Sequence, residues 1–251
     1  MTREFLAALH FLTIWPVPLR ANLPADIWGR SMAFFPLVGM VVGGCLVIAQ
    51  YVLGLLWPPV IVAAGVLAVW IVLTGALHLD GWADCCDGLL VARPPEERLR
   101  ILKDTHIGAF GLAGVVALLL LKFACLQAIA GGPAPIRAAL MLSPVLSRWA
   151  MVCAAVLYPY GRPGQSLGAM FAAHVSRRSL WVSTLLAVVI SALLAGWLGL
   201  ASLVLVGLLT AAAANWTLTR IPGLTGDVYG AVNELSELAV LLVWTAFMSR
   251  L

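Results

Sequence analysis

Long apolar stretches alternate with short polar connections along nearly the whole chain. A helix needs about 20 mainly apolar residues to cross the hydrocarbon core of a membrane. By this criterion the sequence predicts about seven membrane-spanning helices and leaves no soluble domain over. The expected spans are residues 32–57, 60–77, 107–130, 136–157, 180–198, 200–219 and 229–249. The predicted fold is therefore all-α: residues 1–251 form a single polytopic integral membrane domain, a helical bundle.

The first thirty residues precede the expected spans and have a different pattern. Glu4, His10 and two prolines interrupt the apolar positions, and no small-residue cleavage site follows a clean apolar run. A removable signal peptide is therefore not expected. Residues 1–30 instead favour an amphipathic segment that lies at the membrane surface.

Composition agrees with a membrane protein. Hydrophobic residues make up 63% of the chain, charged residues only 10%, and the mean hydropathy is +1.03, whereas soluble domains are about half apolar and a quarter charged. The net charge of +4 does not indicate nucleic-acid binding, because no basic run is long enough. The five cysteines show neither disulfide-framework nor metal-site spacing and are expected to be free thiols; they are residues 45, 85, 86, 125 and 153.

The basic residues predict the orientation of the bundle. Eleven of the fifteen lysines and arginines fall on one side of the expected spans, and only Arg137 and Arg250 fall on the other. The eleven are Arg3, Arg20, Arg30, Arg93, Arg98, Arg100, Lys103, Arg162, Arg177, Arg178 and Arg220. Because cytoplasmic loops are enriched in Lys and Arg, this side is expected to be cytoplasmic, together with the N-terminus. All eleven acidic residues and all four histidines are assigned to the same side, so a cytoplasmic active site is expected.

Three aspartates follow the second expected span, within the sequence GALHLDGWADCCDGLL. Asp80, Asp84 and Asp87 are spaced i, i+4, i+7, so they share about 60° of one helical face if the helix of that span continues through them. Carboxylates this close repel one another near lipid unless a cation or protons intervene. Oxygen ligands of this kind suit Mg²⁺, which binds through one or two carboxylates plus substrate phosphates. The alternative is a solvated polar loop, which a single aspartate would favour.

The next polar segment, RPPEERLRILKDTHIGAFG, predicts a short interfacial helix that begins near two prolines. This helix would deliver Lys103, Asp104 and His106 to the start of the third span. Asp104 is a candidate fourth metal ligand, and Lys103 is a candidate point charge for phosphate.

A second acidic pattern opens the last expected span, GLTGDVYGAVNELSELAVLL. Thr225 or Asp227 is suited to cap the helix, whose N-terminus can also accept a phosphate. Asp227, Glu234 and Glu237 lie on one polar stripe, with Asn233 beside it. The alternative is that these residues only anchor the span at the interface.

Three further basic residues lie outside the three polar motifs. Arg162 is either a phosphate contact or an ordinary cytoplasmic loop residue. Arg148 lies near the middle of its span and must be paired or face a wet cavity. Lys122 is expected to extend to the far interface.

The motifs together resemble the cobalamin (5′-phosphate) synthase family, also called adenosylcobinamide-GDP ribazoletransferase. The resemblance rests on ALHLDGWADCCDGLL, R-x-x-x-LKDTHIGAFG and GLTGDVYGAVNELSE, and more weakly on FLTIWPVP, FFPLVGMVVG and SPVLSRWAM. It therefore covers nearly the whole chain. Where the family usually has Asp-Ser-Arg this chain has Asp104-Thr105-His106, and Ile14 stands where an arginine is common; the aspartates themselves are kept.

The resemblance implies a Mg²⁺-dependent transferase of cobalamin biosynthesis in the cell (inner) membrane. It would join α-ribazole, or its 5′-phosphate, to adenosylcobinamide-GDP and release GMP. Carried over by position, Asp80, Asp84, Asp87 and Asp104 would bind the metal and the pyrophosphate. His78 and Lys103 would flank them, and Arg148 and Arg162 would share the developing charge, with His106 or a spare carboxylate as the base. Thr225, Asp227, Asn233 and Glu234 would complete the pocket.

Other classes of protein remain open from the residues alone. CDP-alcohol phosphotransferases also use an aspartate cluster, but their Gly-x-x-x-Asp-x-x-x-Asp ending is missing here. Membrane prenyltransferases place aspartate-rich motifs on two helices, usually with closer spacing. A cation transporter would need acidic residues in the middle of the membrane. The expected partners are the two small-molecule substrates and the lipid bilayer, without nucleic acid, and a homo-oligomer is compatible with the sequence.

Overall fold

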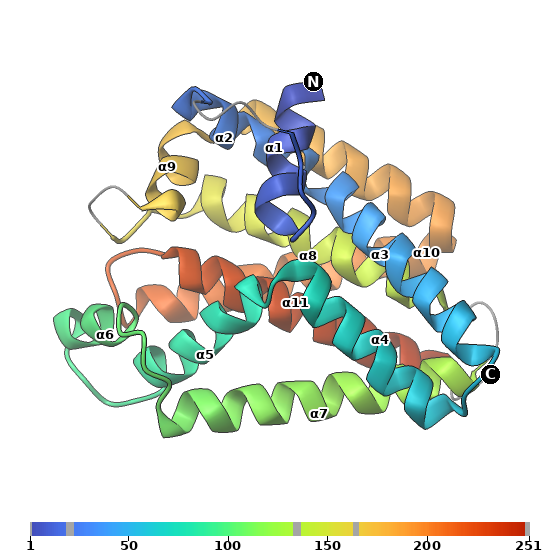
Figure 1. Ribbon diagram of the computed structural model, residues 1–251. Coiled ribbons are helices and arrows are strands. Elements are labelled where there is room, and N and C mark those ends of the chain that lie inside the picture. The colour runs from blue at the N-terminus through green and yellow to red at the C-terminus, as the bar shows by residue number, and fades with distance from the viewer. Residues whose placement is uncertain (1, 19–22, 133–136, 163–165, 249–251) are drawn as a thin grey trace.

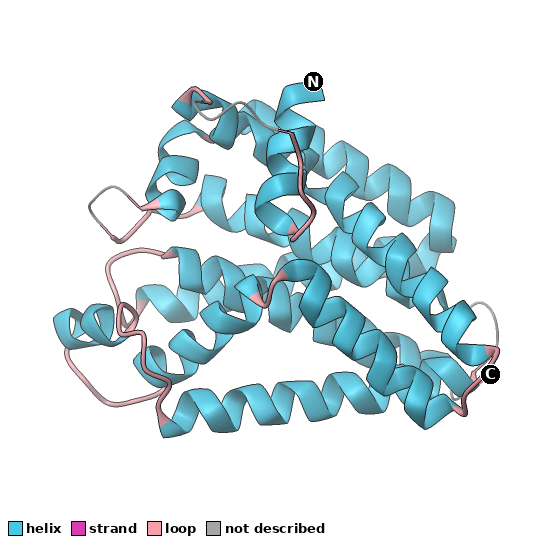
Figure 2. Cartoon of the chain, viewed as in Figure 1, coloured by secondary structure: helices cyan, strands magenta, loops and turns pink. Residues whose placement is uncertain are grey.

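Helices account for all the regular structure in the described part of the chain, as Figures 1 and 2 show. The computed structural model describes residues 2–18, 23–132, 137–162 and 166–248. Outside the helices, Tyr160 and Leu224 form an isolated β-bridge between two loops. The all-α prediction is therefore confirmed. Arg20 and Arg250, which entered the prediction of sidedness, lie outside the described residues.

The helices follow one another with short connections. The N-terminal part contains α1 (Thr2–Leu12), α2 (Ala25–Ser31), the 3₁₀ helix η1 (Met32–Phe34) and α3 (Phe35–Gly54). The middle contains α4 (Pro59–Thr74), α5 (Leu77–Leu89), α6 (Pro95–Ile101) and α7 (Ala109–Gly131). The C-terminal part contains α8 (Ala138–Leu157), α9 (Leu167–His174), α10 (Arg177–Leu218) and α11 (Gly226–Met248).

Five segments within the described residues are long and apolar enough to cross a membrane, and a sixth results if the bent pair α4 and α5 counts as one span. The five are Ala25–Gly54, Ala109–Gly131, Ala138–Leu157, Arg177–Leu218 and Gly226–Phe247. The chain is thus a multi-pass membrane protein, and its apolar runs lie where the sequence predicts them. The two spans expected at 180–198 and 200–219 both fall within α10.

A sharp reversal divides α10 near its middle. Gly196 has φ 54° and ψ −131°, which lies outside the helical region and suits glycine. The indole of Trp149 donates a hydrogen bond to Thr184 Oγ1 at 3.0 Å, and its ring also lies against Gly207. One side chain of α8 therefore touches both limbs of α10, which run side by side. The break between the two limbs lies at Gly196, close to the boundary between the spans expected at 180–198 and 200–219.

A sharp bend separates α4 from α5. The sequence left open whether the helix of the second span continues through the aspartates, and the axes of α4 and α5 differ by 91°. Gly75 ends α4 in the left-handed conformation, and Ala76 also has a positive φ of 55°. The backbone N–H of Ile14 donates to the carbonyl of Leu73 at 3.0 Å, so the segment after α1 packs against this bend. The aspartates therefore lie on a separate helix and do not continue the helix of the second span.

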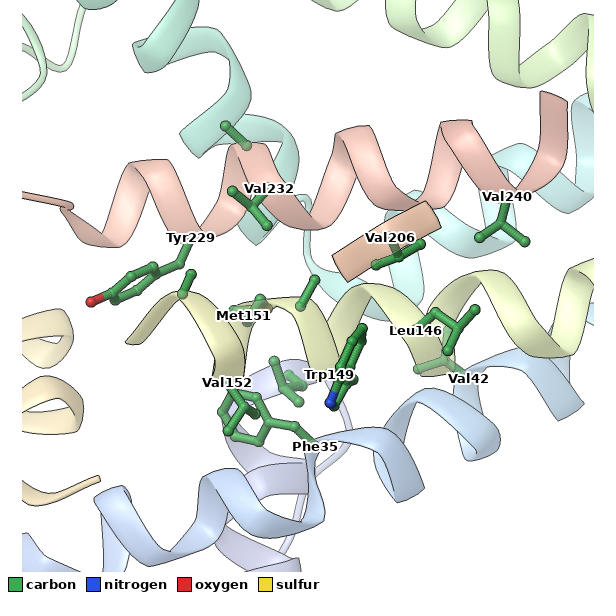
Figure 3. Close-up of a cluster of buried hydrophobic side chains, with 14 of the residues drawn as sticks. Phe35, Val42, Leu146, Trp149, Met151, Val152, Val206, Tyr229, Val232 and Val240 are labelled. Carbon is green, nitrogen blue, oxygen red and sulfur yellow. The ribbon is translucent and has the colours of Figure 1, made fainter. Parts of the chain in front are cut away.

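Helix α8 forms the centre of the bundle. It packs against α3, α10 and α11, and Figure 3 shows its apolar side chains between α3 and α11. Gly39 and Gly43 of α3 allow this contact, because a Cβ on either residue would lie within 3 Å of the α8 backbone. Small residues at such contacts are typical of helix packing in membranes.

The N-terminal segment packs onto the bundle rather than standing apart. It forms α1 and α2, and Ala7, Ala8 and Leu12 of α1 are fully buried. Figure 1 shows α1, α2 and α9 at the same end of the molecule. The five cysteines are free, as predicted, and all but the half-buried Cys45 are buried.

Candidate active site

Helix α5 carries the three aspartates on one face. The spacing of Asp80, Asp84 and Asp87 places them together on a 3.6-residue helix. Asp80 is exposed, whereas Asp84 and Asp87 are half-buried. The facial arrangement predicted from the sequence is therefore present, although it belongs to a separate helix after the bend.

Asp87 connects α5 to the beginning of α7. Its two carboxylate oxygens accept hydrogen bonds from the backbone N–H groups of Gly108 and Gly111, at 2.7 and 2.8 Å. Both positions need glycine, because a Cβ at either would lie 2.5 Å or less from the carboxylate. These N–H groups lack partners within their own helix, so Asp87 acts as the cap of α7.

Asp80 and Asp84 are free to bind a ligand. Neither carboxylate accepts a hydrogen bond within the described residues. Asp84 interacts electrostatically with Asp227 as well as with its neighbours on α5. No group of three or more Asp, Glu, His or Cys side chains in the described part has the geometry to hold a metal ion. Two unpartnered carboxylates do fit Mg²⁺, because this ion takes one or two from the protein and its other ligands from water and phosphate.

The beginning of α11 faces α5 at close range. A Cβ on Gly81 would lie 2.7 Å from the carbonyl oxygen of Asp227, and one on Gly230 would lie 3.1 Å from that of His78. Thr225 accepts a hydrogen bond from the N–H of Val228 at 3.4 Å. The prediction that Thr225 can cap the last helix is therefore confirmed.

Arg162 joins a third segment to this end of α11. Its guanidinium donates to Asp227 Oδ2 at 2.8 Å and to the carbonyl of Leu102 at 3.0 Å. Thr225 donates to the same carboxylate oxygen at 3.1 Å. The N–H of Gly161 and the carbonyl of Leu224 hold the two loops together at 2.8 Å. Arg162, Thr225 and Asp227, predicted separately, thus lie in one cluster.

Lys103, Asp104 and His106 are exposed, and they follow Leu102, whose carbonyl accepts the hydrogen bond from Arg162. Asp104 accepts hydrogen bonds from the ring Nδ1 and the backbone N–H of His106, at 2.8 and 3.1 Å. These bonds lower the pKa of the Asp104 carboxyl. No contact in the described residues connects Asp104 to the aspartates of α5, so its role as a fourth ligand stays a prediction.

The basic residues inside the spans behave differently from the prediction. Lys122 does not reach the far interface: it is buried and donates to Glu234 and Glu237, both at 2.5 Å. Arg148 is fully buried and pairs with Glu237 as well. The expectation that Lys122 extends to the membrane surface was therefore wrong, because two carboxylates of α11 lie within its reach.

The predicted position of the acidic residues of α11 was also wrong. Glu234 and Glu237 are buried between α7, α8 and α11, not placed at one interface as expected. Asn233 donates to Glu237 at 3.2 Å and belongs to the same network. Arg148, Asn233 and Glu234 were predicted to bind substrate. In the structure Arg148 and Asn233 both contact Glu237, and Glu234 contacts Lys122, inside the bundle.

His78 lies between the ion-pair network and a cavity. The cavity has a volume of about 170 Å³ and is bordered by residues of α1, α3, α5, α8, α9 and α11. His78, Asp80 and Asp227 all line it. His78 is 2% exposed, and neither ring nitrogen has a hydrogen-bond partner among the described residues. Sequence reasoning missed the apolar walls of this cavity, Lys122 and Glu237 as ion-pair partners, and the capping role of Asp87.

Comparison with known proteins identifies the family. The family model of cobalamin-5-phosphate synthase matches residues 4–245. The adenosylcobinamide-GDP ribazoletransferase of Desulfitobacterium hafniense (strain Y51) is 38% identical over 244 residues, covering 96% of this chain and 95% of the relative.

The enzyme of the same name from Stutzerimonas stutzeri (strain A1501) is 41% identical over 239 residues, covering 94% and 95%. That from Pseudomonas aeruginosa is 41% identical over 244 residues, covering 96% of each chain. No solved structure matches the chain significantly. The chain belongs to the cobalamin-5-phosphate synthase family of adenosylcobinamide-GDP ribazoletransferases.

Proposed function

We propose that this chain carries out the reaction of its family in the space between α5 and α11. It joins α-ribazole, or α-ribazole 5′-phosphate, to adenosylcobinamide-GDP and releases GMP. The main support is that the unpartnered carboxylates of Asp80 and Asp84 face the Asp227–Arg162 ion pair. Binding of a pyrophosphate group requires carboxylates for a metal ion and a cation of this kind. Phosphoryl transfer depends more on alignment and charge neutralisation than on covalent help.

Each group has a definite task in this proposal. A ribose hydroxyl oxygen forms the new bond to the cobinamide-side phosphorus, the bond from that phosphorus to the GMP oxygen breaks, and a nearby carboxylate or His106 accepts the hydroxyl proton. Asp80 and Asp84 would hold Mg²⁺, which supplies neutralisation of the pyrophosphate charge. Arg162 and Lys103 orient the phosphate oxygens, and Asp227 fixes the guanidinium of Arg162.

Asp84 provides the test of this site. We expect Asp84→Asn to remove Mg²⁺-dependent GMP release from adenosylcobinamide-GDP and α-ribazole, while the purified protein remains folded. Asp104→Asn is the matched control: loss of activity there too would place Asp104 in the metal site, and retained activity would exclude it. Full GMP release by Asp84→Asn would refute the proposed site. CDP-activated lipid serves as the control donor and should release no nucleotide.

The same proposal includes the membrane arrangement. Counting the bent pair α4 and α5 as one crossing and each limb of α10 as another gives the seven crossings expected from the sequence. The end that carries α5, α6 and the start of α11 would face the cytoplasm of the cell (inner) membrane. The supporting observation is that the described arginines and lysines outside the spans, with the exception of Arg137, belong to the segments at this end.

A further inference from the structure

Three phenylalanines from three different helices form one wall of the 170 Å³ cavity. The ring centroid of Phe171 in α9 lies 4.5 Å from that of Phe11 in α1 and 5.9 Å from that of Phe35 in α3. All three side chains line the cavity. Elements far apart in the sequence therefore combine to build an aromatic surface beside the proposed reaction centre.

Two polar groups lie buried in the same cavity without partners. His78 and Tyr229 are 2% and 4% exposed, and both line it. The ring nitrogens of His78 and the hydroxyl of Tyr229 make no hydrogen bond among the described residues. Figure 3 shows the Tyr229 ring extending from α11 past the end of α8. Because burying such groups unpaired is unfavourable, they point to a ligand that bonds to them.

Two carboxylates connect the cavity to the reaction centre. Asp80 and Asp227 border it; in the proposed function Asp80 would bind Mg²⁺ and Asp227 fixes Arg162 beside the pyrophosphate. A ligand seated against the phenylalanines would therefore extend its other end toward the phosphorus that is attacked. A nucleoside has this layout, with a planar base at one end and ribose hydroxyls at the other.

We infer that this cavity binds the base of the ribazole substrate. This inference rests on the proposed function and adds the recognition of the acceptor to it. The base is a dimethylbenzimidazole, a flat and mostly apolar bicycle with one ring nitrogen that accepts a hydrogen bond. The phenylalanines stack on the ring and its methyl groups, and Tyr229 or His78 donates to the ring nitrogen.

The alternatives use fewer of these features. A lipid acyl chain would leave His78 and Tyr229 unpaired, and guanine would bury more polar edges than the wall can satisfy. A larger cavity of about 440 Å³ lies between α5, α7, α10 and α11, but no carboxylate lines it. Of these two cavities in the described part of the chain, the smaller one combines an aromatic wall, buried hydrogen-bonding groups and access to the aspartates.

Equilibrium binding of α-ribazole to the purified full chain tests the inference apart from turnover. Tyr229→Phe keeps the ring and removes the hydroxyl, so we expect affinity to fall about threefold to tenfold. Phe171→Ala should weaken binding about tenfold or more, and Phe171→Leu, which keeps more of the packing, should weaken it less. Gly44→Ala, whose added Cβ would meet nothing within 4 Å, should bind α-ribazole as well as the unaltered protein.

An analogue without the two methyl groups provides a second readout. We expect it to bind the unaltered protein about tenfold more weakly than α-ribazole, with a smaller difference in Phe171→Ala. Unchanged affinity in both Tyr229→Phe and Phe171→Ala would overturn the inference, as would variants that raise only the KM for adenosylcobinamide-GDP. In either case GMP release by the unaltered protein would leave the proposed function standing, whereas its absence would refute that function.

Discussion

At the scale of single residues, the carboxylate of Asp87 has two possible roles, as the cap of α7 and as a metal ligand. It caps α7 through Gly108 and Gly111, and its spacing places it beside Asp80 and Asp84. Loss of an N-terminal cap costs about 1 kcal/mol, and asparagine caps nearly as well as aspartate. Asp87→Ala should therefore lower the free energy of unfolding by about 1 kcal/mol and reduce activity.

The paired variant separates the two roles. Asp87→Asn should keep most of the thermal stability in detergent, because its amide oxygen still accepts one of the two hydrogen bonds. If Asp87 also binds Mg²⁺, Asp87→Asn loses GMP release or needs much more Mg²⁺. A variant that is stable and fully active would restrict Asp87 to the capping role.

The buried ion pairs give a second prediction for single residues. Lys122 contacts Glu234 and Glu237, and Arg148 contacts Glu237. Removing one member of a buried pair costs about 3–5 kcal/mol, because an uncompensated charge remains. Lys122→Met should therefore lower the unfolding temperature markedly.

The control removes a matched pair of charges. Lys122→Met combined with Glu234→Met leaves the Arg148–Glu237 pair intact and the buried charge balanced, so it should restore most of the lost stability. Thermal unfolding of the unaltered chain, Lys122→Met and the double variant in one detergent measures this. A double variant as unstable as Lys122→Met would show that the ion pairs are not what stabilises this contact.

Sequence reasoning succeeded for residues whose role depends on local spacing. Asp80, Asp84 and Thr225 lie where helical periodicity and capping preferences place them. Lys122 was misjudged because its partners are on α11, more than a hundred residues later. Glu234 and Glu237 are buried inside the bundle, so the position of the acidic residues does not exclude a cation transporter. The family comparison excludes that class instead.

At the scale of helices, the approach of α11 to α5 depends on Gly81. A Cβ there would lie 2.7 Å from the Asp227 carbonyl, which is backbone and cannot rotate away. Gly81→Ala should push the helices apart, cost about 1–3 kcal/mol and move Asp227 relative to Asp84. We expect GMP release to fall more than stability alone explains.

Gly44→Ala is the control for this contact. A Cβ on Gly44 meets nothing within 4 Å, so this change in α3 should leave activity unaltered and stability equal or slightly higher. Unfolding temperature and GMP release should be measured on both variants. Equal activity in the two would show that the close approach of α5 and α11 does not position the site.

Helix boundaries were predictable where a glycine lies between two apolar stretches that are each long enough to cross a membrane. The reversal at Gly196 separates two limbs that are each long enough to cross a membrane. The bend after α4 was missed because Gly75 and Ala76 lie inside an apolar run whose composition does not change until the aspartates. Helix α9 and the inward packing of α1 depend on contacts between Phe11, Phe35 and Phe171, which no local pattern reveals.

At the scale of the whole molecule, the bundle was predictable because hydrophobic length alone specifies membrane helices. The order of helices in space was not, since every span is apolar on most sides. The central position of α8 follows from its many small residues and from Gly39 and Gly43 opposite them. The orientation proposed from the charged residues remains to be tested at this scale.

Cysteine accessibility tests that orientation. Lys103 is exposed near α6, and Leu56 is 72% exposed in the α3–α4 turn, at the opposite end of the molecule in Figure 1. If the site faces the cytoplasm, a membrane-impermeant thiol reagent should label Lys103→Cys in inside-out vesicles and Leu56→Cys in right-side-out ones. The native cysteines are buried or half-buried, so the unaltered chain provides the background. Labelling of Lys103→Cys from the outside would reverse the orientation and place the phosphate-binding end on the wrong side of the membrane for nucleotide substrates made in the cytoplasm.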